Sequence, residues 1–197
     1  MKKFFEMLIA VLCLLVPLQI SYGQQAEAPV YKDGDWWRVK VEVVQKGYTR
    51  SGQCDEMYPE YLVRWEQGKP KVYRVSGTMQ EEIDCPSMIR DLLNIPPDER
   101  GWLNFPLSLN KAWSFSYLSG GPGRRSRRNY SENKVTTWEK VHTPKGEFDA
   151  FKIERLINPG LNYYLWYSPA AKAVIVFQRR ATQSDRTVTL VDFNLSK

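Results

Sequence analysis

Two apolar segments near the end of the chain constrain the fold more than any other feature of the sequence. Residues 163–167 and 173–177 are almost entirely aromatic or aliphatic, and Ser168 and Pro169 separate them. Short apolar segments bounded by turn residues are typical of β-strands. Successive side chains of a strand point to opposite faces, so apolar residues lie on both faces here, with Tyr163 on one and Tyr164 on the other. The pattern therefore predicts strands that are covered on both sides.

Further strand patterns occur along the rest of the chain. The alternation is clearest in residues 36–43, where one face carries Trp37, Val39, Val41 and Val43. Residues 61–65 and 72–75 read as a hairpin, because Gly68 and Pro70 between them favour a turn. The other predicted strands cover residues 112–117, 130–141, 151–154 and 186–193, and the alternation in 130–141 places Val135, Thr137, Glu139 and Val141 on one face. The short turns between residues 151 and 177 predict an antiparallel meander.

One segment fits a short helix. Residues 87–93 place their apolar side chains on one stripe, and Pro86 can occupy the first turn. Pro96 and Pro97 then end the helix. Apart from this segment, the patterns predict a mainly β protein.

The N-terminus has the pattern of a secretory signal peptide. Lys2 and Lys3 precede an uncharged apolar run over residues 7–18, and small residues precede Gln24. A membrane anchor is the alternative, but the run is shorter than the roughly 20 apolar residues of a spanning helix. We therefore expect residues 1–23 to be cleaved and residues 24–197 to form a single β domain in the periplasm or the medium.

Two cysteines remain after such a cleavage, Cys54 and Cys85. In an oxidising compartment an even pair predicts one disulfide bond. A metal site is the alternative, but His142 is the sole histidine and no ligand spacing accompanies it. We expect neither a metal nor another cofactor.

Residues 119–129 interrupt the strand pattern with glycine, proline and a cluster of arginines. This stretch predicts an exposed mobile loop, and its cationic residues are Arg124, Arg125, Arg127 and Arg128. The cluster is either solvated or binds anions such as lipid head groups or lipopolysaccharide at a membrane surface. Nucleic acid is not expected, because an exported chain seldom meets it and no aromatic residues alternate with these arginines.

The sequence offers no convincing catalytic set. His142 lies beside Thr143 and Pro144 in a predicted turn, and no Gly-x-Ser-x-Gly motif occurs. The carboxylate pairs Glu81/Glu82 and Glu147/Asp149 could act on sugars, but such pairs in polar turns are usually solvated. We therefore do not expect an enzyme.

The second half of the chain resembles a family of exported bacterial proteins of unknown function. The stretch TPKGEFDAFKIE over residues 143–154, followed by LWYSP and AVIV, is similar to the family pattern "TPxGxFxAxKI…WYSP". Upstream, residues 105–113 are similar to the family's "fPLxxGKxW" segment, with Asn110 in place of the glycine. The resemblance covers roughly residues 103–193 and carries no catalytic residues. It implies a positive φ at Gly146, packing of Phe148 and Phe151, and a strand end at Pro169.

The family's fold resembles that of the LolA/LolB lipoprotein carriers, in which a curved antiparallel sheet forms an unclosed barrel around an acyl-binding cavity. The resemblance implies a single curved antiparallel sheet, a half-barrel, with the short helix across its concave side. We therefore expect an exported, non-enzymatic protein that holds a hydrophobic or lipid-like ligand or assists envelope assembly. Its predicted cavity is lined by Trp113, Phe115, Tyr164 and Trp166.

Two alternatives remain open. The first is a protein-interaction module that docks a partner through its aromatic face, and the second is a glycan hydrolase. The expected partners of the favoured function are a lipid or acyl ligand and an anionic membrane surface. The amino-acid sequence does not specify the oligomeric state.

Overall fold

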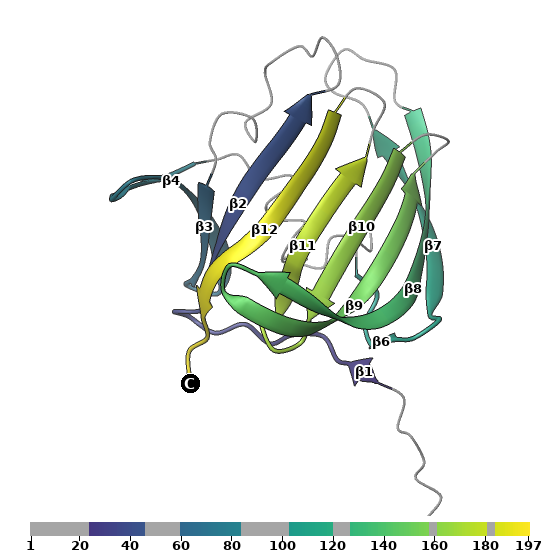
Figure 1. The fold of residues 1–197 in the computed structure, drawn as a ribbon, viewed down its shortest axis with the longest axis horizontal. Coiled ribbons are helices and arrows are strands. Elements are labelled where there is room, and N and C mark those ends of the chain that lie inside the picture. The colour runs from purple at the N-terminus through teal and green to yellow at the C-terminus, as the bar shows by residue number, and fades with distance from the viewer. Residues whose placement is uncertain (1–23, 46–59, 84–102, 120–126, 158–160, 181–183) are drawn as a thin grey trace, which may run out of the picture.

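The computed structural model describes residues 24–45, 60–83, 103–119, 127–157, 161–180 and 184–197 (Figure 1). These residues form antiparallel strands and no helix. A two-stranded sheet pairs β1 (Gln25–Ala26) with β6 (Leu107–Ser108). All other strands belong to one large sheet, which confirms the mainly β class and the antiparallel arrangement.

The large sheet has ten strands, and only one of its neighbour pairs is distant in sequence. Its spatial order is β5 (Met79–Glu82), β4 (Lys69–Ser76), β3 (Glu60–Glu66), β2 (Trp36–Gln45), β12 (Ser184–Asn194), β11 (Ala173–Arg180), β10 (Leu161–Ser168), β9 (Gly146–Ile157), β8 (Arg127–Thr143) and β7 (Ala112–Ser119). The distant pair is β2 with β12, which joins the two halves of the sheet. Within the described residues, β5 and β7 form its edges.

The sheet is strongly curved. Figure 1 shows the β8–β9 hairpin bending at its lower end toward β12, although two strands separate β9 from β12 in the sheet. Lys145 in the hairpin turn lies 2.5 Å from Asp192 of β12, and the rings of Phe148 and Phe193 are 5.8 Å apart. These contacts across two strands require the sheet to curl toward one of its faces.

The predicted strands are confirmed, and their turns follow known local chemistry. Gln67 and Gly68 connect β3 to β4 with positive φ angles of 54° and 71°, which is the pattern of a type I′ hairpin turn. Gly146 has the expected positive φ, at 141°. Asn110 adopts a φ of 64°, and asparagine tolerates this left-handed region better than most residues, so it can replace the glycine of the family pattern.

One face of the sheet, here called the inner face, carries the apolar core. Its fully buried residues include Trp37, Val39, Tyr61, Val63, Ile153, Leu165, Phe177, Val188 and Leu190. Residues 24–35 and 103–108 pack across it: Tyr31 contacts Trp37 and Trp65, and Phe105 contacts Tyr167. Burial raises the pKa of Tyr31 above its usual range. The opposite face is called the outer face below.

A β-bulge corrects one predicted pattern. The prediction placed Val135 and Thr137 on one face of a regular strand, but the pairing of β8 with β9 shifts between these two residues. After the bulge Trp138 pairs with Phe151, and their rings lie 4.4 Å apart. A bulge inserts one extra residue, so every later side chain of the strand changes face.

The predicted loop over residues 119–129 is shorter in the structure. Ser119 ends β7 and residues 127–129 begin β8, because these strands pair up to Ser119 and Arg127. Arg124 and Arg125 lie outside the described residues. So do the predicted signal peptide, the predicted helix over 87–93, Cys54 and Cys85. In the described part of the chain, no helix is long and apolar enough to cross a membrane.

The pairing of Cys54 with Cys85 therefore stays a prediction. A bond that closes the chain between them should stabilise the fold by roughly 3–4 kcal/mol on the chain-entropy model. Titration of thiols in the denatured, unreduced mature protein should find none. Two titratable thiols per chain would contradict the pairing.

Candidate functional site

The structure divides the four predicted ligand residues between the two faces of the sheet. Trp113 pairs directly with Asn133, Asn133 with Arg155, and Arg155 with Tyr163. Directly paired residues share a face, so Trp113 and Phe115 point to the inner face. Tyr164 and Trp166 follow Tyr163 at odd spacing and point to the outer face. Trp113 and Tyr164 nevertheless both line the trough described below, whereas Phe115 and Trp166 are not among its lining residues.

Long cationic side chains cover the aromatic residues of the outer face. The ammonium group of Lys152 lies 5.5 Å from the ring centre of Tyr164 and 5.6 Å from that of Trp166. The guanidinium group of Arg180 lies 5.6 Å from the Tyr164 ring, and the indole of Trp166 donates a hydrogen bond to Glu139 at 2.6 Å. The apolar stems of Lys and Arg can cover such rings while their charges stay in water. The outer face is thus covered by side chains of the sheet itself.

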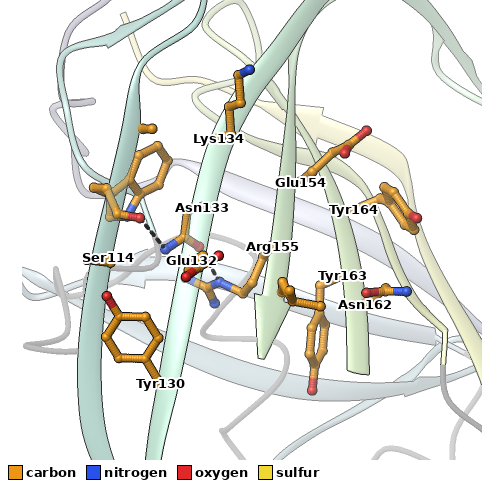
Figure 2. A pocket seen from close by; sticks show the side chains of 13 residues that line it. Ser114, Tyr130, Glu132, Asn133, Lys134, Glu154, Arg155, Asn162, Tyr163 and Tyr164 are labelled. Carbon is orange, nitrogen blue, oxygen red and sulfur yellow. Dashed lines mark hydrogen bonds between the residues drawn. The ribbon is translucent and has the colours of Figure 1, made fainter. Parts of the chain in front are cut away.

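A shallow trough of about 690 Å³ crosses the outer face over β7 to β10. Three adjacent rows of cross-strand neighbours line it: Ala112, Lys134, Glu154 and Tyr164 in the first, Trp113, Asn133, Arg155 and Tyr163 in the second, and Ser114, Glu132, Leu156 and Asn162 in the third. Tyr130, which pairs with Ser116 and lies two residues before Glu132 on β8, completes the lining (Figure 2). Tyr130 and Leu156 are 51% and 45% exposed, which leaves apolar surface among the charges.

The inner face carries three arginines in one row of cross-strand neighbours. Arg155 of β9 pairs with Tyr163 of β10, Tyr163 pairs with Arg179 of β11, and Arg179 pairs with Arg186 of β12. We call Arg155, Arg179 and Arg186 the arginine row. It lies near the ends of β9 and β11, at the upper end of the sheet in Figure 1, one row beyond the apolar core residues Ile153, Leu165, Phe177 and Val188.

Arg155 is the best defined member of the row. Only 2% of it is exposed, and its Nε donates to Oδ1 of Asn133 at 2.6 Å. Asn133 in turn donates to the carbonyl oxygen of Trp113 at 3.3 Å (Figure 2). The guanidinium group lies 5.2 Å from the ring centre of Phe115. Of the two inner-face residues predicted to bind ligand, Phe115 therefore lies against a buried cation, and the backbone of Trp113 is linked to that cation through Asn133.

Arg179 and Arg186 are direct neighbours on adjacent strands. Like charges at such positions destabilise a sheet, and burial makes an uncompensated charge costly. Arg186 is nevertheless only 3% exposed. Arg186 has a further interaction within the chain, as does Arg155. The sheet therefore keeps three cations close together on its least solvated face.

Sequence reasoning missed the arginine row, although a signal for it was present. Arg155 lies between Ile153 and Ile157 in the two-residue alternation, and Arg186 precedes Val188 by two positions. Each arginine thus occupies a position where the pattern calls for an apolar residue. The predicted basic cluster lies elsewhere: Arg128 is exposed at the start of β8, on the outer side of the same end of the sheet.

The carboxylate pairs considered for catalysis are engaged in exposed ion pairs. Glu147 lies 3.0 Å from Lys140 and 2.9 Å from His142, and Lys140 holds the pKa of the Glu147 carboxyl below its usual range. Glu81 pairs with Arg74. A general acid needs a raised pKa, so this environment is unfavourable for Glu147. Across the described ranges, no group of three or more His, Cys, Asp or Glu residues could hold a metal ion.

Comparisons with known proteins give weak similarities in structure alone. No protein-family model and no curated protein sequence matches the chain. Among solved structures, similarity is found to a candidate exported protein with a YmcC-like fold from Bacteroides fragilis, with 11% identity, a TM-score of 0.39, and coverage of 86% of this chain and 99% of that one.

Two further solved structures have similar sequence identities, TM-scores and coverages. The hypothetical lipoprotein YmcC from Escherichia coli has 13% identity and a TM-score of 0.34, with 97% of each chain covered. A candidate lipoprotein from Parabacteroides distasonis has 12% identity and a TM-score of 0.36, with 86% of this chain and 99% of that one covered. With TM-scores below 0.5, these similarities decide neither family nor function.

Proposed function

We propose that this chain is an exported, non-enzymatic protein that binds a hydrophobic or lipid-like ligand against the inner face of a half-barrel. The signal pattern of residues 1–23 supports export, and the curl of the β8–β9 hairpin toward β12 supports an unclosed barrel. The resemblance to acyl-binding carriers points to the same class of ligand.

The observation that carries the proposal is the partial exposure of the inner-face aromatic residues on β7. Trp113, Phe115 and Tyr117 are each only partly buried, whereas the apolar inner-face residues in the middle of the sheet are fully buried. Aromatic side chains are the largest source of apolar contact area, at 150–250 Å² each when covered. The three aromatic side chains on the edge strand β7 therefore offer an apolar ligand a surface that is continuous with the apolar core.

The size of this surface fits a moderate affinity. If a ligand covers about 300 Å² of it, burial contributes roughly 7 kcal/mol at about 25 cal/mol per Å². Association costs reduce this value, and the ligand's own buried surface adds to it. Since a micromolar dissociation constant corresponds to about 8 kcal/mol, an acyl chain is expected to bind in the micromolar range.

Binding of a fluorescent fatty acid tests the proposal. The mature chain, residues 24–197, should bind parinaric acid at one saturable site. Phe115→Ala should weaken binding about 10-fold, because it removes one aromatic ring from the inner face. Tyr164→Ala is the matched control, since it removes a ring from the outer face and should leave the affinity unchanged. Absence of saturable binding by the folded mature chain would refute the proposed function.

The exposed Tyr130 and Leu156 in the outer trough favour the interaction module as the second candidate. In its simplest form a second copy covers the trough. Tryptophan fluorescence of the mature chain would then shift with protein concentration, and Leu156→Asp would abolish the shift. A chain that stays monomeric, with fluorescence independent of concentration, would count against self-docking on this face.

A further inference from the structure

Strand β7 is an open edge of the large sheet and has none of the usual protection against pairing with a further strand. It is eight residues long and pairs with β8 on one side, and no strand in the described part of the chain lies on its other side (Figure 1). Natural proteins protect such edges by shortening them or by placing charges, proline or a bulge there. β7 contains no charged residue and no proline, and its pairing with β8 is regular throughout.

The other edge strand of the described sheet, β5, has such protection. It is only four residues long, all four residues are exposed, and Glu81 and Glu82 give it two negative charges. Two copies of β5 placed side by side would bring these carboxylates against each other, and like charges on paired strands are destabilising. Of these two edges, β7 is therefore the one suited to pairing with a further strand.

The backbone groups of every second residue of β7 point away from β8. The N–H of Val135 donates to the carbonyl oxygen of Lys111 at 2.9 Å, so these two residues form a hydrogen-bonded pair just before β7 begins. In an antiparallel ladder, such pairs alternate with pairs whose backbone groups point away from each other. The register of β7 with β8 therefore directs to the open edge the N–H and C=O groups of four exposed residues, Ala112, Ser114, Ser116 and Leu118.

The sequence of β7 is nearly symmetrical about Phe115. Trp113 and Tyr117 flank Phe115 at equal spacing on the inner face, and Ser114 and Ser116 flank it on the outer face. If two β7 strands pair about a twofold axis through Phe115, Trp113 lies opposite the partner's Tyr117 and Ser114 lies opposite the partner's Ser116. Aromatic residues directly across two strands stabilise a sheet, and no like charges meet within these strands. The strand is thus complementary to itself.

We propose that a second copy of this chain pairs with the open edge of β7 through its own β7, in antiparallel orientation, so that the two ten-stranded sheets form one continuous sheet. The twofold register also pairs Ala112 with the partner's Leu118, so all the outward backbone groups of β7 gain a hydrogen-bond partner. A twofold contact uses the same surface on both copies and closes the assembly at a dimer. The inference does not depend on ligand binding, although the dimer places the aromatic side chains of both β7 strands next to each other on the inner face.

Sedimentation velocity of the mature chain, residues 24–197, tests the proposal in the absence of ligand. A junction of one strand from each copy is only about 27 Å long. It is therefore smaller than a standard interface, which buries about 800 Å² per partner. We expect a monomer–dimer equilibrium with a dissociation constant in the micromolar range.

Ser116→Pro tests the open edge directly. Proline removes the outward N–H of residue 116, which the ladder with β8 does not use, and edge strands tolerate proline at such positions. The dissociation constant of the dimer should rise at least about 10-fold, because each copy loses one hydrogen bond across the junction. Ser116→Ala is the matched control, since it keeps the N–H and should leave the dissociation constant unchanged.

Charged variants test whether the partner is a second copy. One chain carries Ser114→Lys and Ser116→Lys, and the other carries Ser114→Glu and Ser116→Glu. Each should be monomeric by itself, because like charges then lie directly opposite each other, whereas an equimolar mixture should form a dimer. Both residues are exposed on the outer face, so the substitutions are compatible with the fold. If Ser116→Pro does not fold, as judged by circular dichroism, the charged variants decide.

The outcomes separate this interface from the proposals above. A mature chain that stays monomeric well above micromolar concentrations would overturn the inference, and so would a dimer that neither Ser116→Pro nor the charged substitutions weaken. A dimer that only Leu156→Asp abolishes would assign self-association to the outer trough instead. Fatty-acid binding by a chain that stays monomeric would leave the proposed function intact, whereas a dimer that binds no fatty acid would refute that function alone.

Discussion

Replacing Trp37 with alanine is expected to lower the free energy of unfolding by about 3–5 kcal/mol, the usual cost of truncating a fully buried large aromatic side chain. Trp37 lies on the inner face of β2 and is fully buried. Its indole Nε1 donates to the carbonyl oxygen of Ala171 at 2.7 Å, and the Tyr31 ring packs edge-on at 5.6 Å. Truncation therefore removes apolar contacts and leaves a buried carbonyl without its donor.

Trp36→Ala is the matched control for this experiment. Trp36 is the preceding residue of the same strand, points to the outer face and is only partly buried. Its replacement should cost about 1–2 kcal/mol, and Trp37→Phe, which keeps a ring but loses the N–H group, should fall between the two. Urea denaturation followed by circular dichroism gives all three values. Equal losses in Trp36→Ala and Trp37→Ala would contradict the assignment of faces.

The second large effect is expected from Asp35, a fully buried carboxylate. Its Oδ2 accepts a hydrogen bond from the backbone N–H of Lys32 at 3.0 Å, and its Oδ1 accepts one from the backbone N–H of Ser196 at 2.6 Å. The ammonium group of Lys172 lies 3.6 Å from Oδ2. One carboxylate thus connects the N-terminal segment, the C-terminal end and the turn between β10 and β11.

Asp35→Ala should cost about 3–5 kcal/mol, because it leaves two partly buried backbone donors without their acceptor and removes the carboxylate beside Lys172, which keeps only the carbonyl oxygen of Val30. Asp33→Ala is the control: Asp33 accepts one exposed hydrogen bond, from the N–H of Gly68 at 3.0 Å. That control should cost no more than about 1 kcal/mol. Hydrogen exchange at Ser196 should also become faster in Asp35→Ala alone. A loss of stability no larger in Asp35→Ala than in Asp33→Ala would argue against the role of this carboxylate.

The strands were predictable because alternation and turn chemistry are local properties. Residues 36–43, 163–167 and 173–177 all lie in strands, and Gly146 adopts the positive φ that its turn requires. Strand order is not local. Nothing in the composition of β12 indicates that it pairs with β2, which begins close to the other end of the described chain.

The candidate site was less predictable than the fold, since it depends on register. Trp113, Phe115, Tyr164 and Trp166 were grouped by their aromatic character, but cross-strand pairing assigns them to opposite faces. Arg155, Arg179 and Arg186 are far apart in sequence and become neighbours only through three successive ladders. A one-residue shift in any of these ladders would move an arginine to the other face.

The sequence pattern predicted cover for both faces of these strands, but on the outer face the rings of Tyr164 and Trp166 are only partly buried. For Tyr164 and Trp166 the expected cover was a helix, a ligand or a partner. In the structure Lys152 and Arg180 lie over these rings. A pattern that counts lysine and arginine as purely polar overlooks their apolar stems, which can cover an aromatic surface.

The pairing of β2 with β12 has a consequence for the time course of folding. Strands β3 to β5 on one side and β7 to β11 on the other can each pair with their sequence neighbours early, because closing short loops costs little chain entropy. The ladder that unites them runs from Trp36 with Asn194 to Gln45 with Ser184. The two halves can therefore join only after β12 has been synthesised, long after β2. Completion of this sheet is expected to be a slow step of folding, because it depends on a contact between distant parts of the chain.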